Sequence, residues 1–371
     1  MPSFNSNLLK RLCETPGIPG REERVRALIE SEIRSPKIFD EVRTDAMGSL
    51  ICRRGPRGPK GKKIEPSAKK SKSATPAPQP TRVMLLCHMD QIGWYVKGVD
   101  EKGFIRLNAA GGFDTRNMFS SRVLVCTPTG DLPAVMNPGG RPIHIASEED
   151  KKKIPEVKEF LVDTGLPPDL VKKRVKIGDY VVWDEPPLDM GDKFVSKCLD
   201  NRVACWLGIE ALRQIHEAEV PHAAELFVAF TTQEEVGLRG AKTASFGVDP
   251  DIGVGLDVTL ACDTPGVPTD EMVTEHGKGF GLHVMDSSFI ADYRLVDEIE
   301  AVATKHKIPC QRTILARGGQ DGAAAQMATK GARAVGIVVG TRYIHTVTEM
   351  LDKRDLAAAR DILAAWLPSI E

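Results

Sequence analysis

The 371-residue sequence has no long apolar run, no excess of one charge and few aromatic residues. A membrane span needs about 18 consecutive apolar residues, and no stretch approaches that length. The first 30 residues carry charges throughout and contain no apolar segment of the secretory type. The formal net charge of −1 argues against a nucleic-acid-binding protein. We therefore expect a cytoplasmic protein with no membrane partner and no nucleic-acid partner.

The sequence also lacks a Cys-x-x-Cys pair, because its eight cysteines are scattered between positions 13 and 310. In a chain of this length, scattered cysteines are typical of reduced, buried thiols and not of a disulfide framework or a zinc ribbon. Hydrophobic residues make up 42% of the chain, which is enough for a sizeable core. The length predicts two domains, or one large domain that carries an insertion.

One segment differs in composition from the rest of the chain. Residues 53–82 are rich in Lys, Arg, Pro, Ser and Gly. Nine Lys or Arg against one acid give residues 53–72 a formal charge of about +8, which leaves about −9 for the remainder. Such a segment buries too little apolar surface to offset the entropy lost on ordering, so we predict a mobile loop. It has no interleaved aromatic residues, so a surface insertion is favoured over a segment that binds nucleic acid or a membrane.

Apolar runs and helical patterns alternate along most of the chain. Short continuous apolar runs are typical of buried strands in a parallel sheet. Four such runs lie at 83–87, 226–232, 252–257 and 334–339. Apolar residues recur at helical spacing over 201–216, and a second helix is expected over 352–366 after a cap at Asp352. This alternation predicts an α/β fold in which helices cover a mainly parallel sheet.

Residues 95–187 have a different texture, in which short β-like pieces are separated by Gly, Pro and Asp turns. This pattern predicts a small β-rich insertion domain with one helix, near 150–161 or 167–174. The predicted organisation is therefore a core formed by residues 1–94 and 188–371, which this insertion interrupts.

Acidic and imidazole side chains follow the predicted strands at the points where the strands end. In open α/β sheets, ligands and catalytic groups gather at the carboxyl ends of the strands. The residues at these positions are His88, Asp90, Glu234, Glu235, Asp257 and His345, with Asp200 at the start of the 201–216 helix. A single histidine is more often a core or surface residue than a ligand, but the convergence of several positions favours a metal site. Imidazole and carboxylate ligands suit Zn²⁺, Co²⁺ or Mn²⁺.

Six blocks of the sequence resemble those of a known family. The blocks are LLCHMDQIGW, LDNR, FTTQEEVGLRGA, GLDVTLACDTPG, GGQDGAAAQMATKG and RYIHTVTEM. They are similar to the signature blocks of the metallo-aminopeptidases that include tetrahedral aminopeptidase and glutamyl aminopeptidase. Some members of that family carry the label endoglucanase or cellulase M. The resemblance extends over nearly the whole chain and implies a zinc-peptidase-like catalytic core with an inserted dimerisation domain.

Carried over position by position, the resemblance implies five metal ligands and two catalytic residues. The implied ligands of two divalent ions (Zn²⁺ or Co²⁺, with Mn²⁺ as the alternative) are His88, Asp200, Glu235, Asp257 and His345. Asp200 is then shared by both ions. Glu234 corresponds to the general base, and Asp90 to the carboxylate that orients the imidazole of His88. These roles agree with the chemistry, because a pair of metal ions lowers the pKa of a water molecule and a nearby carboxylate accepts its proton.

Two further groups of residues bear on the substrate. Arg239, Gly319 and Asp321 are candidate substrate-binding residues, since glycines in their loops let the backbone approach a ligand closely. Gln91 and Gln320 depart from the usual pattern of the family, in which Gln91 is commonly acidic and Gln320 is commonly threonine. Neither is an implied ligand, so these departures bear on substrate contacts or on the surroundings of the ligands.

The resemblance implies an aminopeptidase that acts on peptides with a free N-terminus and forms a homo-oligomer, from a dimer up to a dodecamer. A deacylase or a carboxypeptidase would share the core ligand chemistry and is the first alternative. A glycosidase needs two carboxyl groups across a sugar cleft and no metal, and 5% aromatic residues offer little surface for sugar stacking. A non-catalytic interaction protein is the third alternative, against which the complete ligand set argues.

Overall fold

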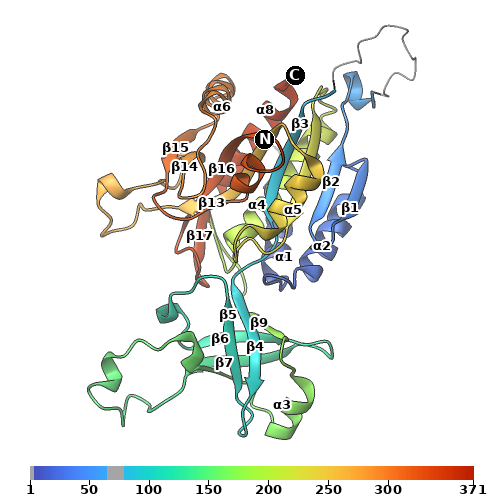
Figure 1. Cartoon of the computed structure of the whole chain (residues 1–371). Coiled ribbons are helices and arrows are strands. Elements are labelled where there is room, and N and C mark those ends of the chain that lie inside the picture. The colour runs from blue at the N-terminus through green and yellow to red at the C-terminus, as the bar shows by residue number, and fades with distance from the viewer. Residues whose placement is uncertain (1–3, 65–78) are drawn as a thin grey trace.

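The computed structural model describes residues 4–64 and 79–371 and has two parts (Figure 1). The larger part is a layered α/β domain built on a sheet that has 11 strands within the described residues. The smaller part is a closed β-barrel that follows the strand ending at His88. None of the described helices is both long enough and apolar enough to cross a membrane.

Four parallel strands form the centre of the sheet. Their spatial order is β12 (Glu225–Thr231), β3 (Arg82–His88), β13 (Ile252–Leu260) and β16 (Arg333–Arg342). Nearly every residue of these strands is buried, which explains their continuous apolar runs. The four strands predicted from those runs are confirmed. Because the strands are parallel, their carboxyl ends lie at one edge of the sheet.

The outer strands make the sheet mixed, so the prediction of a mainly parallel sheet was wrong outside its centre. Each outer strand pairs with its inner neighbour in an antiparallel direction, except that β15 pairs with β14 in parallel. Short turns connect β1 to β2 and β10 to β11, and so short a connection permits only antiparallel pairing. The outer strands are β1 (Glu41–Thr44), β2 (Leu50–Arg54), β10 (Leu188–Met190), β11 (Lys193–Ser196), β14 (Phe280–Met285), β15 (Cys310–Ile314) and β17 (Glu349–Asp352).

Helices cover both faces of the sheet. One face packs against α5 (Arg239–Val248) and α7 (Gly322–Gln326). The helices on the other face are α1 (Ser6–Glu14), α2 (Glu23–Arg34), α4 (Leu199–Glu217), α6 (Tyr293–His306) and α8 (Lys353–Trp366). The two predicted helices correspond to α4 and α8, and Asp352 caps α8 by accepting a hydrogen bond from Arg354 N at 2.8 Å.

The barrel has the spatial strand order β4–β5–β8–β7–β6–β9. Its strands are β4 (Gly93–Val99), β5 (Ile105–Ala110), β6 (Ser121–Cys126), β7 (Leu132–Pro138), β8 (Phe160–Asp163) and β9 (Tyr180–Trp183). The helix α3 (Pro168–Arg174) confirms the second of the two predicted helix positions. The alternative position, 150–161, holds two 3₁₀ turns on either side of Pro155 in place of a helix. The predicted domain boundaries and the dimerisation role of this part stay predictions.

The first turn of α2 and the residues just before it contact the barrel. Arg24 donates two hydrogen bonds to Asp131 of the barrel, at 2.7 and 2.8 Å. The guanidinium of Arg21 lies 4.7 Å from the ring centre of Tyr180. Since β4 begins a few residues after the end of β3, the barrel lies beside the carboxyl edge of the central strands (Figure 1).

The segment predicted as one mobile loop, residues 53–82, is ordered at both ends, so that prediction was wrong there. Arg54 and Arg57 are only 1% and 6% exposed. Arg57 donates to both carboxylate oxygens of Asp40 at 2.8 Å, and this distant partner compensates the burial of its charge. The end of the segment belongs to β3. Residues 65–78 lie outside the described part of the chain.

His222 is buried beside these arginines in an arrangement that requires a neutral ring. Its Nδ1 donates to the Ala224 carbonyl at 2.9 Å, and its Nε2 accepts from Arg54 Nε at 3.3 Å. Burial, with the charges of Arg54 and Arg57 adding to it, lowers the pKa of His222 to about 4. In the unfolded chain the pKa of histidine is about 6.5. Between these two pKa values the unfolded chain therefore binds more protons than the folded chain. The free energy of unfolding falls as the pH decreases through that window.

The variant His222→Gln should flatten this acid dependence. Glutamine retains a polar side chain but takes up no proton, so the Tm values of wild type and variant should differ most at neutral pH. They should converge as the pH falls towards the pKa of about 4. Differential scanning fluorimetry over this range measures the difference, and a gap in Tm that stays constant with pH would contradict the assignment.

Candidate metal centre

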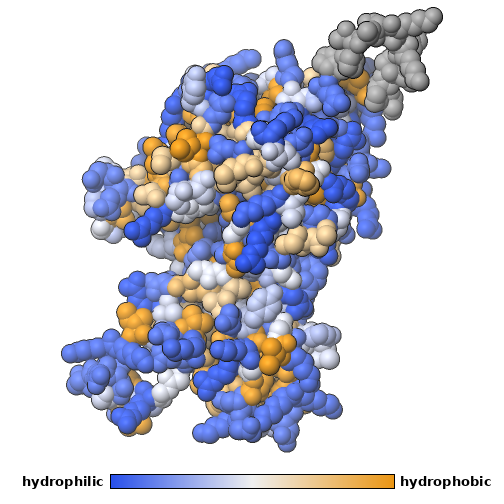
Figure 2. Space-filling view, viewed as in Figure 1, coloured by the Kyte–Doolittle hydropathy of each residue, from blue (hydrophilic) through white to orange (hydrophobic). Residues whose placement is uncertain are grey.

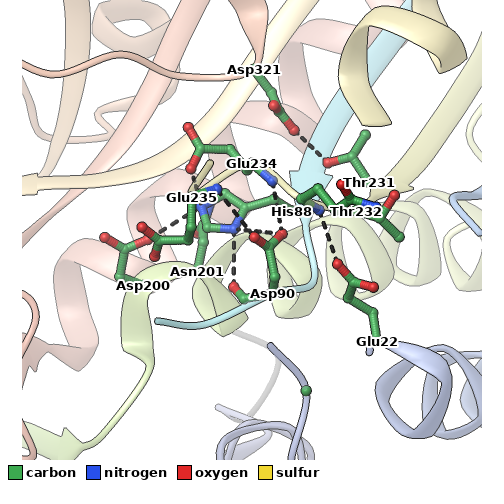
Figure 3. Close-up of polar contacts among 12 residues, drawn as sticks. Glu22, His88, Asp90, Asp200, Asn201, Thr231, Thr232, Glu234, Glu235 and Asp321 are labelled. Atoms are coloured by element: carbon green, nitrogen blue, oxygen red, sulfur yellow. Dashed lines mark hydrogen bonds and ion pairs between the residues drawn. The ribbon is translucent and has the colours of Figure 1, made fainter. Parts of the chain in front are cut away.

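Side chains from separate segments meet at the carboxyl edge of the central strands (Figure 3). Six residues contribute these side chains. One of them, Asp200, lies at the start of α4, and the other five lie in or just after a central strand. The others are His88 in β3, Glu234 and Glu235 after β12, Asp257 in β13 and His345 after β16. The structure thus brings together the six residues that the sequence analysis assigned as ligands or general base.

The donor atoms form two groups that Asp200 joins. In one group, donor atoms of His88, Glu234 and Asp257 lie within 4.8 Å of one another, and in the other those of Asp200, Glu235 and His345 do so. Asp200 Oδ1 lies 3.2 Å from His88 Nε2, and its Oδ2 lies 3.4 Å from His345 Nε2. The two oxygens of Asp200 therefore face the two groups, which is the geometry of a bridging carboxylate.

The electrostatics of these groups call for a cation. Burial raises the pKa of Glu235 and of Asp257, and the charge of nearby Asp200 raises both further. Among the described residues, the two histidines are the ion-pair partners of Asp200, Glu234 and Glu235, and no Lys or Arg joins them. Glu235 Oε1 is buried without a hydrogen-bond partner. Burying so many carboxylates is costly without compensating charge, so the donor set fits bound divalent cations.

Asp90 is fully buried and contacts the glutamate pair more closely than the histidine. Its Oδ1 accepts from Glu234 N, and its Oδ2 accepts from Glu235 N, both at 3.1 Å. The Asp90 carbonyl lies 3.1 Å from His88 Nδ1, whereas the carboxylate Oδ1 lies 3.6 Å from it. The hydrogen-bond partner of the imidazole is therefore the main chain of Asp90. Its carboxylate fixes the backbone of Glu234 and Glu235 (Figure 3).

Two buried carboxylates that were not predicted from the sequence hold the backbone of this site. Glu22 is 4% exposed, and its Oε1 accepts from Gly20 N at 2.8 Å and from Gln233 N at 2.9 Å. Glu349 is 2% exposed and bonds the amides of two candidate ligands. Glu349 stands in the block RYIHTVTEM, four residues after a candidate ligand, and an acid that opens a buried strand could have drawn attention to it.

The three candidate substrate-binding residues differ in their surroundings. Asp321 is 1% exposed, accepts a hydrogen bond from Thr231 Oγ1, and has its pKa raised to about 6 by burial. Arg239 is exposed and donates to Gln233 Oε1 at 3.4 Å. Gly319 is exposed beside Ser288. The charge of His88 acts against this rise in the pKa of Asp321.

The two departures from the family pattern are buried side chains. Gln91 is 1% exposed, and its Oε1 accepts from Lys197 Nζ at 3.4 Å. Gln320 is 3% exposed and packs against Gly255 of β13, where a Cβ atom would lie 1.4 Å from Gln320 Oε1. Both therefore belong to the packing around the site and not to its exposed surface.

Several known proteins with similar sequences and structures are named peptidases or aminopeptidases, and some similar structures carry the name endoglucanase. The lysyl aminopeptidase of Pyrococcus furiosus is 29% identical, over 98% of this chain and 97% of its own length. The TET aminopeptidase of the marine sediment archaeon Thaumarchaeota archaeon SCGC AB-539-E09 is 28% identical with a TM-score of 0.88, over 99% of this chain and 96% of its own. The TET1 peptidase of Pyrococcus horikoshii, described as assembling into a tetrahedron or a large octahedral shell, is 26% identical with a TM-score of 0.82, over 98% of both chains.

The family comparison covers most of the sequence. The model of the family described as M42 glutamyl aminopeptidase matches residues 70–362, which include all the residues that form the two donor groups. The match spans well over half of the chain and agrees with the resemblance noted from the sequence blocks. The chain therefore belongs to the M42 glutamyl aminopeptidase family.

Proposed function

We propose that the protein is a metal-dependent aminopeptidase that hydrolyses N-terminal residues from peptides with a free N-terminus. The observation that carries this proposal is the pair of donor groups joined by Asp200, with Glu234 beside His88. The lysyl aminopeptidase and the TET peptidases to which the chain is similar support the same reaction class.

In this proposal Asp200 is shared between two divalent ions. His88 and Asp257 complete one site, and Glu235 and His345 complete the other. Imidazole and carboxylate donors suit Zn²⁺ or Co²⁺ best, with Mn²⁺ as the alternative. When bound, the two ions lower the pKa of a water molecule and polarise the carbonyl that is to be attacked.

Glu234 is the proposed general base. Burial raises its pKa against the opposing charge of His88, whose Nε2 lies 3.7 Å from Glu234 Oε2. A carboxylate whose pKa is raised accepts a proton from water readily and can return it to the leaving amine. Glu235 is not free for this task, because its Oε2 lies 3.5 Å from His345 Nε2 in the other donor group. Asp90 is the proposed positioning group, since it holds the amides of both glutamates.

The substrate is proposed to enter with its ammonium group facing the acidic side of the site. Asp321 Oδ1 is buried and has no hydrogen-bond partner, so this carboxylate has an acceptor to spare close to Glu234. Arg239 and Gly319 remain proposed substrate contacts at the exposed rim. A deacylase or carboxypeptidase would use the same donor groups, but no contact in the site favours either over an aminopeptidase.

A homo-oligomer, of a size between a dimer and a dodecamer, is proposed to assemble through the barrel. The TET1 peptidase of Pyrococcus horikoshii is described as assembling into a tetrahedron or a large octahedral shell, and the barrel of the present chain exposes several large apolar side chains. These residues are Phe119, Val135, Ile143, Ile145 and Ile154. Multi-angle light scattering that gave a strict monomer would contradict this part of the proposal.

The reaction class is tested with a panel of aminoacyl-nitroanilides, each with a free and with an acetylated amino group. We expect hydrolysis of the free forms after addition of Zn²⁺, Co²⁺ or Mn²⁺, and no hydrolysis after chelation. The acetylated substrates serve as the matched control, because they differ only in the ammonium group. Equal release of nitroaniline from both forms would argue for an endopeptidase, and release of acetate from the acetylated forms would argue for a deacylase. Failure on every peptide with two ions bound would overturn the function.

A further inference from the structure

Glu349 bridges two of the candidate ligands through their main chains. It is the first residue of β17 and is 2% exposed. Its Oε1 accepts from His345 N at 2.8 Å, and its Oε2 accepts from Asp200 N at 3.0 Å. Glu349 is not a member of either donor group. The carboxylate therefore contacts the backbone of the two candidate ligands and not their donor atoms. Each of its two oxygens accepts a hydrogen bond from a different amide.

Regular secondary structure does not hold the two amides that Glu349 bonds. Asp200 has a non-helical backbone (φ −77°, ψ 103°) at the entrance of α4. His345 has a positive φ of 64° in the loop before β17, and its side chain is 33% exposed. A non-glycine residue keeps a left-handed backbone only where its surroundings impose it. The two hydrogen bonds that Glu349 accepts restrain the backbone of both residues.

The sheet explains why one carboxylate can reach both segments. Glu349 is the register partner of Ser196, which ends β11 four residues before Asp200. β17 in turn follows the loop that contains His345. The pairing of β11 with β17 therefore brings the chain that leads to Asp200 close to the chain that follows His345. Glu349 lies where these two segments meet.

We propose that Glu349 is a positioning residue that sets the separation of Asp200 from His345 and thereby the affinity of the site formed by Asp200, Glu235 and His345 for its divalent ion. This inference rests on the metal centre of the proposed function. Partners that orient metal ligands typically change metal affinity about 10- to 100-fold when they are lost. The other site keeps His88 and Asp257, which Glu349 does not contact, and is affected less.

The variant Glu349→Gln tests this role with a minimal change of shape. An amide has one acceptor oxygen, so its NH₂ group faces one of the two backbone amides and that hydrogen bond is lost. We expect isothermal titration with Zn²⁺ or Co²⁺ to show one site weakened about 10- to 100-fold and the other changed by no more than about threefold. For Co²⁺, the visible absorption band of the weakened site should appear only at higher metal concentration.

The variant Asp355→Asn is the matched control. Asp355 is 1% exposed and bridges two backbone amides in the same way, with Oδ1 accepting from Gly279 N at 2.8 Å and Oδ2 from Gly277 N at 2.7 Å. It lies on α8 and contacts none of the candidate ligands. Its replacement should lower the Tm as Glu349→Gln does but leave both metal affinities unchanged. Equal weakening in the two variants would show a general loss of stability and overturn the proposal.

The result also separates this inference from the proposed function. If wild type and Glu349→Gln bind both ions equally well, the role of Glu349 is wrong while the metal centre stands. If the expected loss of affinity is seen but no peptide is hydrolysed, the function is wrong and the role of Glu349 stands. If wild type binds no divalent ion, both fall.

Should Glu349→Gln fail to fold, hydrogen exchange of the metal-free wild type supplies the test. The amides of Asp200 and His345 are expected to be protected without metal, because Glu349 accepts from both. Exchange of these two amides at the rate of an unstructured chain would overturn the proposal.

Discussion

Replacing Glu234 with glutamine is expected to lower kcat by about 10²- to 10⁴-fold, the usual contribution of a general acid–base group. Metal content should stay near two ions per chain. Glutamine has the shape of glutamate, and its main-chain bond to Asp90, at 3.1 Å in the wild type, does not depend on the side chain. Only the capacity to accept a proton is removed. Inductively coupled plasma mass spectrometry and initial rates on the same preparation measure the two effects together.

Glu235→Gln is the matched control for this prediction, because the two glutamates are neighbours with different surroundings. Glu235 Oε2 lies in the group with Asp200 and His345, so its replacement should lower the metal content as well as the rate. Donor atoms of Glu234, His88 and Asp257 also lie within 4.8 Å of one another, which makes Glu234 a competitor for the role of ligand. Loss of metal in Glu234→Gln would support that role, and full activity in this variant would sink the assignment of the base.

Replacing Asp200 with alanine is expected to remove both ions, because Asp200 is the residue that faces both histidines, at 3.2 and 3.4 Å. Activity should fall to the background rate. A bound ion raises the free energy of unfolding by about 2.7 kcal/mol when its free concentration is about 100 times its Kd. The Tm of Asp200→Ala should therefore no longer respond to added metal or to EDTA, whereas that of the wild type should fall on chelation.

Asp257→Ala is the comparison for Asp200→Ala. Asp257 belongs to only one of the two donor groups, the one that contains His88. This variant should therefore lose one ion, and its Tm should still respond in part to added metal. Metal titrations followed by thermal unfolding compare the two variants directly. If Asp200→Ala still binds two ions with unchanged affinity, Asp200 is not a bridging ligand, and the two donor groups act independently.

The positions of the central strands and of the candidate ligands could be predicted from the sequence because both depend on local patterns. A strand buried on both faces needs a continuous apolar run, and a polar residue just past such a run lies at the sheet edge whatever the distant chain does. His88, Glu235 and Asp257 were found in this way. Their assignment as metal ligands, like that of Glu234 as the general base, came from the resemblance of whole sequence blocks. Both assignments stay predictions.

Other features depend on partners far away in the sequence and could not be predicted in this way. Arg54 and Arg57 lie in a basic segment that has the composition of a mobile loop, yet Asp40 and His222 give them buried partners. The antiparallel direction of the outer strands is equally hidden, since an apolar run specifies a buried strand but not the direction of its neighbour. Composition reports the cost of burying a group, whereas only the fold reveals what compensates it.

The sequence by itself determined the α/β class, the four central strands, and the set of imidazole and carboxylate groups at their carboxyl ends. Only the tertiary structure decided which oxygens face which partners. It placed the two oxygens of Asp200 toward different histidines, turned the carboxylate of Asp90 to the amides of the glutamate pair, and brought Glu349 between Asp200 and His345. The physical reason is that a hydrogen bond forms over about 3 Å and is directional, so it depends on how distant segments pack and leaves no periodic trace in the sequence.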